Sequence, residues 1–246
     1  MNRFFVMKKN IIGNTIYIRD LEDVKHIVKV LRLKPKEKIE VSDGEQFEYF
    51  AEISNLSKDS VEAVILKKQH FQREPFTFIT LYQGIPKQNK MENIIQKSVE
   101  LGVCRIIPFF SERTVVKDKG NSLKKVERWQ KISIEASKQC KRGIIPKVEN
   151  PLSFHEMLKD IQDKNMTLFL YEDEKKTMIK DILKIQDSIK AQRIAVIVGP
   201  EGGFSLNEVR HAEKAGAISV SVGKTILRTE TAGIAALAMV LYELEG

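Results

Sequence analysis

The sequence predicts an α/β protein with a small β-barrel over residues 1–72 and a larger domain with a parallel sheet over residues 73–246. The first domain carries several short runs of β-branched and aromatic residues, which are typical of half-buried strands. From Pro75 onward, apolar strands alternate with amphipathic helices, a rhythm that indicates a sheet covered on both faces. The polar stretch Gln69–Glu74 marks the boundary between the two domains.

The first domain is predicted to be mostly β-structure, with one helix over Asp23–Leu33 that Pro35 ends. Ser42–Glu45 has the composition of a turn between two strands. So many short strands in so few residues imply a small barrel. The predicted strands are Phe4–Met7, Ile16–Ile18, Lys38–Ser42, Phe47–Ile53 and Val61–Leu66.

In the second domain, strands and helices follow each other in turn, and Gly102 stands where a helix C-cap is expected. The predicted strands are Phe76–Tyr82, Arg105–Phe109, Leu168–Tyr171, Ile194–Val198 and Ile218–Val222. The predicted helices are Lys90–Leu101, Lys124–Arg142, Ser205–Ala215 and Thr231–Leu244.

Composition excludes several classes of protein. No apolar run is long enough to cross a bilayer, and the first residues are too soon interrupted by lysine to form a secretory signal. Cys104 and Cys140 lack metal-ligand spacing, so we expect ordinary thiols of a cytoplasmic protein and no metal. The net charge is +8, and the excess positive charge lies mainly in residues 73–150, which favours a polyanionic partner.

The segment Val198–Phe204 is the first candidate site, because three glycines directly follow a predicted strand. Glycines at this place let the backbone turn sharply and approach a ligand closely. Ser205 is the expected N-cap of the next helix, with Glu208 completing a capping box. A tight turn without a ligand fits the pattern about equally well. The spacing is neither a dinucleotide fingerprint nor a P-loop.

The segment Gly223–Gly233 is the second candidate, between the last strand and the last helix. Thr229 and Glu230 suit a helix start, where hydroxyl and carboxylate groups satisfy free N–H groups. Arg228 does not suit that place unless an anion or a polar ligand engages it. The alanine-rich helix that follows indicates either buried core or a subunit interface.

The third candidate is a basic stripe on the predicted helix over residues 124–142. Its cations recur at helical spacing and could follow a phosphate backbone, although a solvated face with internal ion pairs fits equally well. The stripe consists of Arg128, Lys131, Lys138 and Arg142, with Glu135 among them.

Together these segments resemble the ribosomal small subunit methyltransferase E family of the SPOUT superfamily, in order and spacing throughout residues 76–246. The N-terminal segment is similar to that family's small barrel, which is related to the PUA domain. The matching segments are Gln96–Val103, Pro108–Arg113, Arg128-Trp129, Glu135-Ala136, Gln139, Arg142, Gly199–Phe204 with Glu208, and Ile226–Ala232.

The resemblance implies a SPOUT domain with a trefoil knot, a homodimer, and methylation of N3 of one uridine in 16S ribosomal RNA. The cofactor it implies is S-adenosyl-L-methionine. The residues it assigns to cofactor binding are Leu170, Tyr171, Glu172, Val198, Gly199, Pro200, Glu201, Gly203, Val222, Gly223, Ile226, Leu227, Thr229, Thr231 and Ala232.

Two residues are expected to act in the reaction. Arg228 would stabilise negative charge on the uracil or hold a neighbouring phosphate, and Glu230 would position groups or accept a proton. The expected RNA contacts are Arg113, Arg128, Lys138 and Arg142.

One departure from the family pattern is visible. Lys87-Gln88-Asn89 stands where the family usually has Lys-Gly-Asp/Glu, which affects the role expected of this loop.

Two other functions stay open. One is a SPOUT methyltransferase that acts on transfer RNA or large-subunit RNA, and the other is a ribosome-assembly factor that binds RNA without catalysis.

Overall fold

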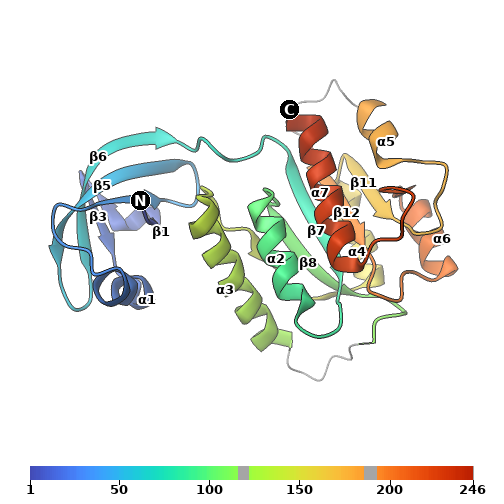
Figure 1. The fold of residues 1–246 in the computed structure, drawn as a ribbon, viewed down its shortest axis with the longest axis horizontal. Helices are drawn as coiled ribbons and strands as arrows, with labels where there is room; N and C mark the ends of the chain where they lie inside the picture. The colour runs from blue at the N-terminus through green and yellow to red at the C-terminus, as the bar shows by residue number, and fades with distance from the viewer. Residues whose placement is uncertain (116–121, 186–192, 246) are drawn as a thin grey trace. The chain divides into compact units, whose positions relative to one another are not determined.

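The computed structural model describes residues 1–115, 122–185 and 193–245, and it divides into two compact units. The first unit consists of Met1–Glu74 and Ser137–Ile145, and the second of Pro75–Ala136 and Pro146–Gly246. The protein is an α/β protein with a β-domain at its N-terminus and a parallel sheet in the second unit (Figure 1). The trefoil knot implied by the resemblance stays a prediction.

The first unit is built on a six-stranded sheet in the order β1-β4-β5-β6-β3-β2, in which only the β1–β4 pair is parallel. Alternate strand residues, such as Ile16, Ile39 and Ala51, point into a buried apolar core. The two-residue strand β2 is an addition to the prediction. The strands are β1 Arg3–Phe5, β2 Ile11–Ile12, β3 Thr15–Ile18, β4 Lys38–Ser42, β5 Phe47–Leu56 and β6 Val61–His70.

The predicted helix of this unit begins earlier and is less regular than expected. Asp20 is its N-cap, because the side chain accepts a hydrogen bond from the backbone N–H of Asp23 at 3.0 Å. The α-helix α1 (Leu21–Lys25) then continues as the π-helical turn η2 (His26–Val30). A 3-10 turn, η1 (Lys8–Asn10), precedes β2.

The segment Ser137–Ile145 is held to the rest of the first unit by polar contacts. Arg3 is buried, and its guanidinium donates to the Lys141 carbonyl at 2.6 Å and the Arg142 carbonyl at 2.7 Å. The same guanidinium pairs with Glu48. These bonds satisfy carbonyl groups just beyond helix α3 (Ser122–Cys140), so the end of this helix depends on residues near the N-terminus.

The second unit is built on a parallel sheet in the order β10-β8-β7-β12-β11-β13, with β9 also paired to β8. The central strands are continuous buried apolar runs, as expected of a parallel sheet covered on both faces. The strands are β7 Phe78–Gly84, β8 Arg105–Phe110, β9 Lys147–Val148, β10 Leu152–Ser153, β11 Met166–Leu170, β12 Arg193–Val198 and β13 Ile218–Val220.

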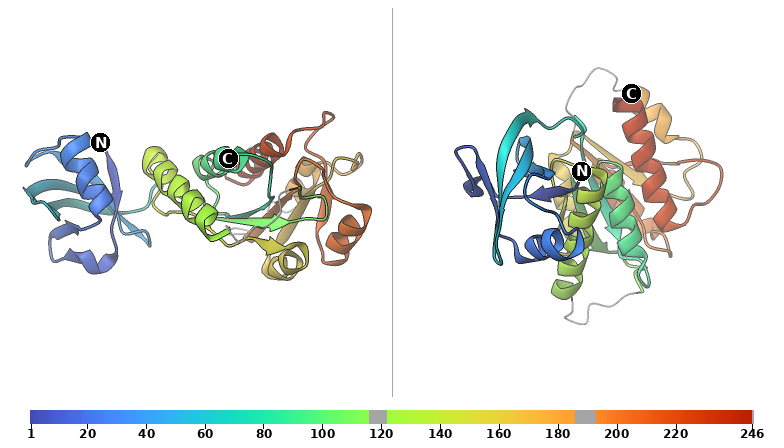
Figure 2. Two further views of the ribbon diagram at one scale, coloured as in Figure 1. Left: turned by 90° about the horizontal axis from the view of Figure 1, so that it is seen from below. Right: turned by 60° about the vertical axis from the view of Figure 1, so that its left-hand side comes forward.

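Helices lie on both sides of this sheet (Figure 2). Helix α7 packs on β12 and contacts α2 and α5, whereas α4 contacts α6 and β8 on the other side. The C-cap of α2 is Leu101, and Gly102, predicted as the C-cap, follows it with the left-handed φ of +98° and donates its N–H to the Val99 carbonyl at 3.0 Å. The helices are α2 Lys90–Glu100, α4 Phe154–Asp160, α5 Ile179–Ile185, α6 Leu206–Lys214 and α7 Thr229–Glu245, with the 3-10 turn η3 Ile161–Asp163 after α4.

Several bounds differ from the predicted ones. Helix α3 ends at Cys140, because Lys141 has φ +60° and cannot continue the helix. Helix α7 begins at Thr229, two residues earlier than predicted. Helices α4 and α5 are additions to the prediction, each only two turns long. Within the described ranges, no helix is both long and apolar enough to span a membrane.

Candidate active site

A pocket of about 830 Å³ opens where the parallel strands β11, β12 and β13 end. Its walls are the loops that follow these strands. In parallel α/β sheets, ligands bind in such crevices at the carboxyl ends of the strands. All the predicted cofactor residues line this pocket except Thr231, which is exposed on the first turn of α7.

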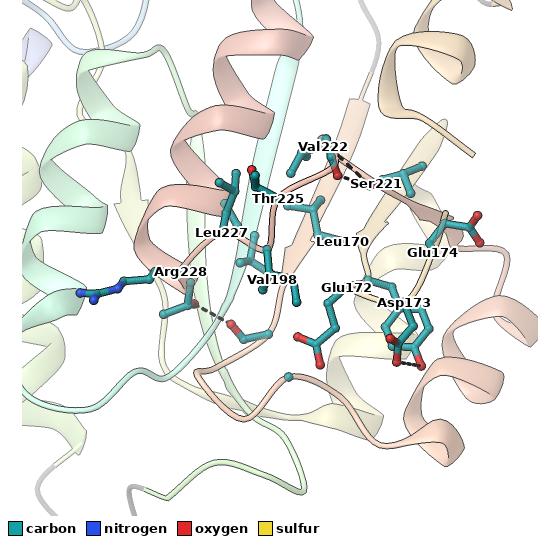
Figure 3. A pocket seen from close by; sticks show the side chains of 18 of the residues that line it. Leu170, Glu172, Asp173, Glu174, Val198, Ser221, Val222, Thr225, Leu227 and Arg228 are labelled. Atoms are coloured by element: carbon teal, nitrogen blue, oxygen red, sulfur yellow. Dashed lines mark hydrogen bonds between the residues drawn. The ribbon is translucent and has the colours of Figure 1, made fainter. Parts of the chain in front are cut away.

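The pocket has an apolar middle and charged sides (Figure 3). Leu170, Val198 and Leu227 lie together in its middle. Glu172 and its acidic neighbours lie to one side, whereas the side chain of Arg228 extends away from the other labelled residues on the opposite side. The site can therefore hold an uncharged ring system beside groups that bind polar or cationic atoms.

The glycine loop after β12 needs its glycines. Gly203 has φ +63°, and a Cβ atom there would lie 2.8 Å from a carboxylate oxygen of Glu172. A Cβ at Gly199 would lie 2.9 Å from the Phe204 ring. Ser205 and Glu208 form the predicted capping box, with hydrogen bonds of 3.2 Å and 2.9 Å. The loop is therefore tightly packed, and residues other than glycine at positions 199 and 203 would not allow its shape.

Phe204 anchors this loop to the core of the second unit. Its side chain is only 3% exposed, and its ring centroid lies 4.2 Å from that of Phe169. The rings of Phe109 and Phe154 lie 6.2 Å and 6.3 Å away. Aromatic pairs at these separations attract each other beyond the effect of burial alone, so the ring cluster fixes the end of the glycine loop.

A hydrogen-bond chain joins the loop to two other elements. Gln83, at the end of β7, donates from Nε2 to the Thr229 hydroxyl at 2.9 Å. That hydroxyl donates to the Gly199 carbonyl at 2.6 Å. Thr229 thus orients the loop backbone, in addition to lining the pocket. Sequence reasoning missed Gln83, although a polar residue at the end of an apolar central strand is a signal that could have found it.

The loop after β11 supplies acidic groups that sequence reasoning did not single out beyond Glu172. The Tyr171 hydroxyl donates to Asp173 at 3.2 Å, and burial together with this carboxylate raises the Tyr171 pKa. Glu174 accepts backbone hydrogen bonds from Thr177 and Lys176, which lower its pKa. The carboxyl group of Glu174 therefore stays ionised and shapes the loop.

Lys90 brings Glu201 and Glu230 together beside the pocket. Its Nζ lies 3.0 Å from a Glu201 oxygen and 3.3 Å from a Glu230 oxygen. Burial opposes ionisation of Glu201, but hydrogen bonds from Lys90 and backbone groups outweigh it and lower the Glu201 pKa. Glu201 and Lys90 line the pocket, whereas Glu230 is not a lining residue and pairs with Lys90.

The four predicted RNA contacts do not share one environment. Arg113 is exposed and donates to the Gly202 carbonyl at 3.0 Å, and the Arg128 side chain is 63% exposed and 2.7 Å from Glu92. Both belong to the second unit. Lys138 and Arg142 belong to the first unit, where Lys138 pairs with Asp23 at 2.6 Å.

Contrary to the prediction, Arg142 does not belong to an exposed basic stripe but is a buried residue with a structural role. It lies beyond the end of α3, its side chain is 4% exposed, and its guanidinium pairs with Glu74 at 2.6 Å. Glu74 also accepts from the backbone N–H of Gly143 at 2.6 Å. Because a buried, paired guanidinium cannot reach a phosphate without breaking these bonds, the exposed part of the stripe ends before Arg142.

Gln88 stands in a backbone conformation that suits glycine, with φ +57°. Gln88→Gly is therefore expected to be more stable than Gln88→Ala by about 1 kcal/mol, because only glycine adopts this conformation without steric cost. Thermal unfolding of both variants measures the difference. Equal melting temperatures would show that the loop relaxes when its side chain is removed.

The pocket at the carboxyl ends of parallel strands is a ligand site of the α/β type, and the family models assign the chain to the RNA methyltransferases. Residues 72–241 match the family model of the RNA methyltransferase domain, and residues 18–66 match that of the RNA methyltransferase PUA domain. The chain belongs to the ribosomal RNA small subunit methyltransferase E family.

Named relatives and a solved structure show the extent of this similarity. The chain is 34% identical to ribosomal RNA small subunit methyltransferase E of Bacillus subtilis, covering 100% of this chain and 98% of the relative. It is 37% identical to the enzyme of that name from Buchnera aphidicola subsp. Schizaphis graminum, covering 86% and 84%. The Neisseria gonorrhoeae enzyme, solved bound to S-adenosyl methionine, has a TM-score of 0.87 at 34% identity and covers 99% and 98%.

Proposed function

We propose that the protein transfers a methyl group from S-adenosyl-L-methionine to N3 of one uridine in 16S ribosomal RNA, in the cytoplasm. The observation that carries the proposal is the pocket at the ends of three parallel strands, lined by residues that the family resemblance assigns to the cofactor. Relatives named as small-subunit ribosomal RNA methyltransferases, and one structure bound to S-adenosyl methionine, support it.

The residues present fit this cofactor. The apolar middle of the pocket suits an adenine ring, and the glycine loop lines the pocket with backbone that packs closely on Phe204 and Glu172 because Gly199 and Gly203 carry no Cβ. Glu172 faces the glycine loop and can accept hydrogen bonds from ribose hydroxyls. When bound, the cofactor supplies an electrophilic methyl group on a sulfonium, and the protein supplies alignment and exclusion of water.

The protein's own groups then act on the uracil. N3 carries a proton, and the base must be unstacked before N3 can be reached. Arg228 lines the pocket and is exposed, so its guanidinium can stabilise negative charge on the uracil or hold a neighbouring phosphate. The carboxylate of Glu230 is paired with Lys90, and we therefore assign Glu230 to positioning.

The proposal includes a homodimer formed through α7. This helix exposes the apolar side chain of Met239 and the ring of Tyr242, which is 82% exposed. Most other residues of the helix are small or apolar. Such a helix face is typical of a subunit interface. Light scattering of Tyr242→Glu against the unmodified protein tests this part, and a monomer in both cases would contradict it.

A methylation assay tests the function. Small ribosomal subunits from cells that lack this protein are incubated with labelled S-adenosylmethionine, and their RNA is digested to nucleosides for mass spectrometry. Stoichiometric 3-methyluridine is the expected product. Labelling of transfer RNA or large-subunit RNA instead would overturn the substrate, and no transfer to any RNA would favour a non-catalytic assembly factor.

The exposed cations Arg113 and Arg128 are expected to bind the RNA backbone. Their joint replacement with glutamine should weaken RNA binding. It should also make the negative slope of log affinity against log salt less steep, by roughly 0.7 for each phosphate that is no longer neutralised. Filter binding at several salt concentrations measures the slope. Lys147→Gln serves as the control, because Lys147 is also exposed and paired with a carboxylate. An unchanged slope in the double variant would place the RNA-binding face elsewhere.

A further inference from the structure

Lys90 is the first residue of α2 and contacts two carboxylates from other parts of the chain. Glu201 belongs to the glycine loop, and Glu230 belongs to the first turn of α7. The backbone N–H of Lys87 donates to the same Glu201 carboxylate, at 3.1 Å and 3.2 Å to its two oxygens. One end of α2 is thus attached to both elements that form the pocket wall.

The glycine loop has two different attachments. At its base, Gly84 approaches Pro200 so closely that a Cβ there would lie 2.6 Å from the proline ring. Packing therefore fixes the base of the loop. Beyond it, the side chain of Glu201 is held by polar groups of α2 and of the turn before it. The geometry of this part of the pocket wall depends on charge as well as on packing.

A single ammonium group compensates both carboxylates. An ammonium has three donors, enough to serve two acceptors at once. Both oxygens lie within 3.3 Å of Nζ, so removal of the cation would leave two neighbouring negative charges in a partly buried place. Their repulsion would push the glycine loop and the first turn of α7 apart.

We propose that Lys90 is a positioning residue for methyl transfer, which holds the glycine loop through Glu201 and the start of α7, next to Arg228, through Glu230. This inference rests on the proposed function, since it assigns Lys90 to the same pocket. The carboxylates of Glu201 and Glu230 beside the ammonium also keep the Lys90 pKa above its usual value.

The test compares Lys90→Met with Lys90→Arg in the full-length protein. Calorimetry measures the Kd for S-adenosylmethionine, and steady-state kinetics on small subunits separates kcat from KM. Lys90→Met is expected to raise the cofactor Kd roughly tenfold and to lower kcat, with Lys90→Arg recovering most of the activity. Lys97→Met is the matched control, because Lys97 stands on the same helix but pairs with Glu100, one turn further along that helix.

A second comparison separates positioning from simple loss of stability. In a Glu201→Gln, Glu230→Gln background, Lys90→Met should have a much smaller effect on cofactor Kd, because no repulsion remains to be screened. An equal effect in both backgrounds would overturn the positioning role. If the unmodified protein binds no S-adenosylmethionine, the proposed function fails. If it binds and Lys90→Met binds equally well with equal kcat, the inference about Lys90 fails alone.

Discussion

Replacement of Phe204 with alanine is expected to lower the free energy of unfolding by about 3–5 kcal/mol. The ring is buried and packed against three other aromatic rings, and its neighbours belong to elements that cannot easily move into the space. The glycine loop would also lose its anchor, since the ring lies directly against Gly199. Cofactor binding should therefore weaken in the fraction that remains folded.

Urea unfolding followed by circular dichroism measures this change in stability. Phe76→Ala is a suitable control, because Phe76 is 86% exposed and its replacement creates no cavity. This control should change stability by less than about 0.5 kcal/mol. A decrease of less than about 1 kcal/mol for Phe204→Ala would mean that the ring cluster collapses around the missing side chain, so that the loop is held by other contacts.

Arg228→Ala is expected to lower kcat by roughly a hundredfold, or about 3 kcal/mol in the activation free energy. Its side chain is exposed and extends away from the apolar middle of the pocket. A group so placed can reach the base or the phosphate of an RNA substrate, so the variant should bind S-adenosylmethionine normally. Single-turnover methylation of small subunits, with calorimetry of cofactor binding beside it, measures both quantities.

Arg210→Ala provides the control, because Arg210 is also an exposed arginine but lies on α6, outside the pocket lining. Its turnover should equal that of the unmodified protein. Undiminished turnover of Arg228→Ala would remove this residue from the reaction. Weak cofactor binding in that variant would instead assign Arg228 to the cofactor.

The parts of the fold that local patterns determine could be predicted from the sequence. Continuous apolar runs predicted the central strands, and the Ser205–Glu208 pair predicted the start of α6. Gly102 predicted the end of α2, because its left-handed conformation is local. By contrast, β2 has two residues, and a pairing so short leaves no periodic pattern.

The parts of the site that depend on distant pairing could not be predicted in this way. Gln83 bonds to Thr229, and Lys90 pairs with Glu201 and Glu230. Each of these partners lies more than a hundred positions further along the chain. Arg142 fitted a helical stripe by its spacing, yet the helix had already ended at Cys140. Nothing in local spacing reveals that its partner is Glu74.

The discontinuous make-up of the first unit matters for biosynthesis. Arg3, Ser42 and Glu74 bond to residues 141–143, so these polar groups gain these partners only after that segment has left the ribosome. A nascent chain that ends after residue 74 would leave buried donors of Arg3 and the Glu74 carboxylate without these partners, and such incomplete chains are prone to chaperone capture. A fragment made for study in isolation would meet the same difficulty, and a linker that appends residues 137–145 to residues 1–74 would be the way to supply what it lacks.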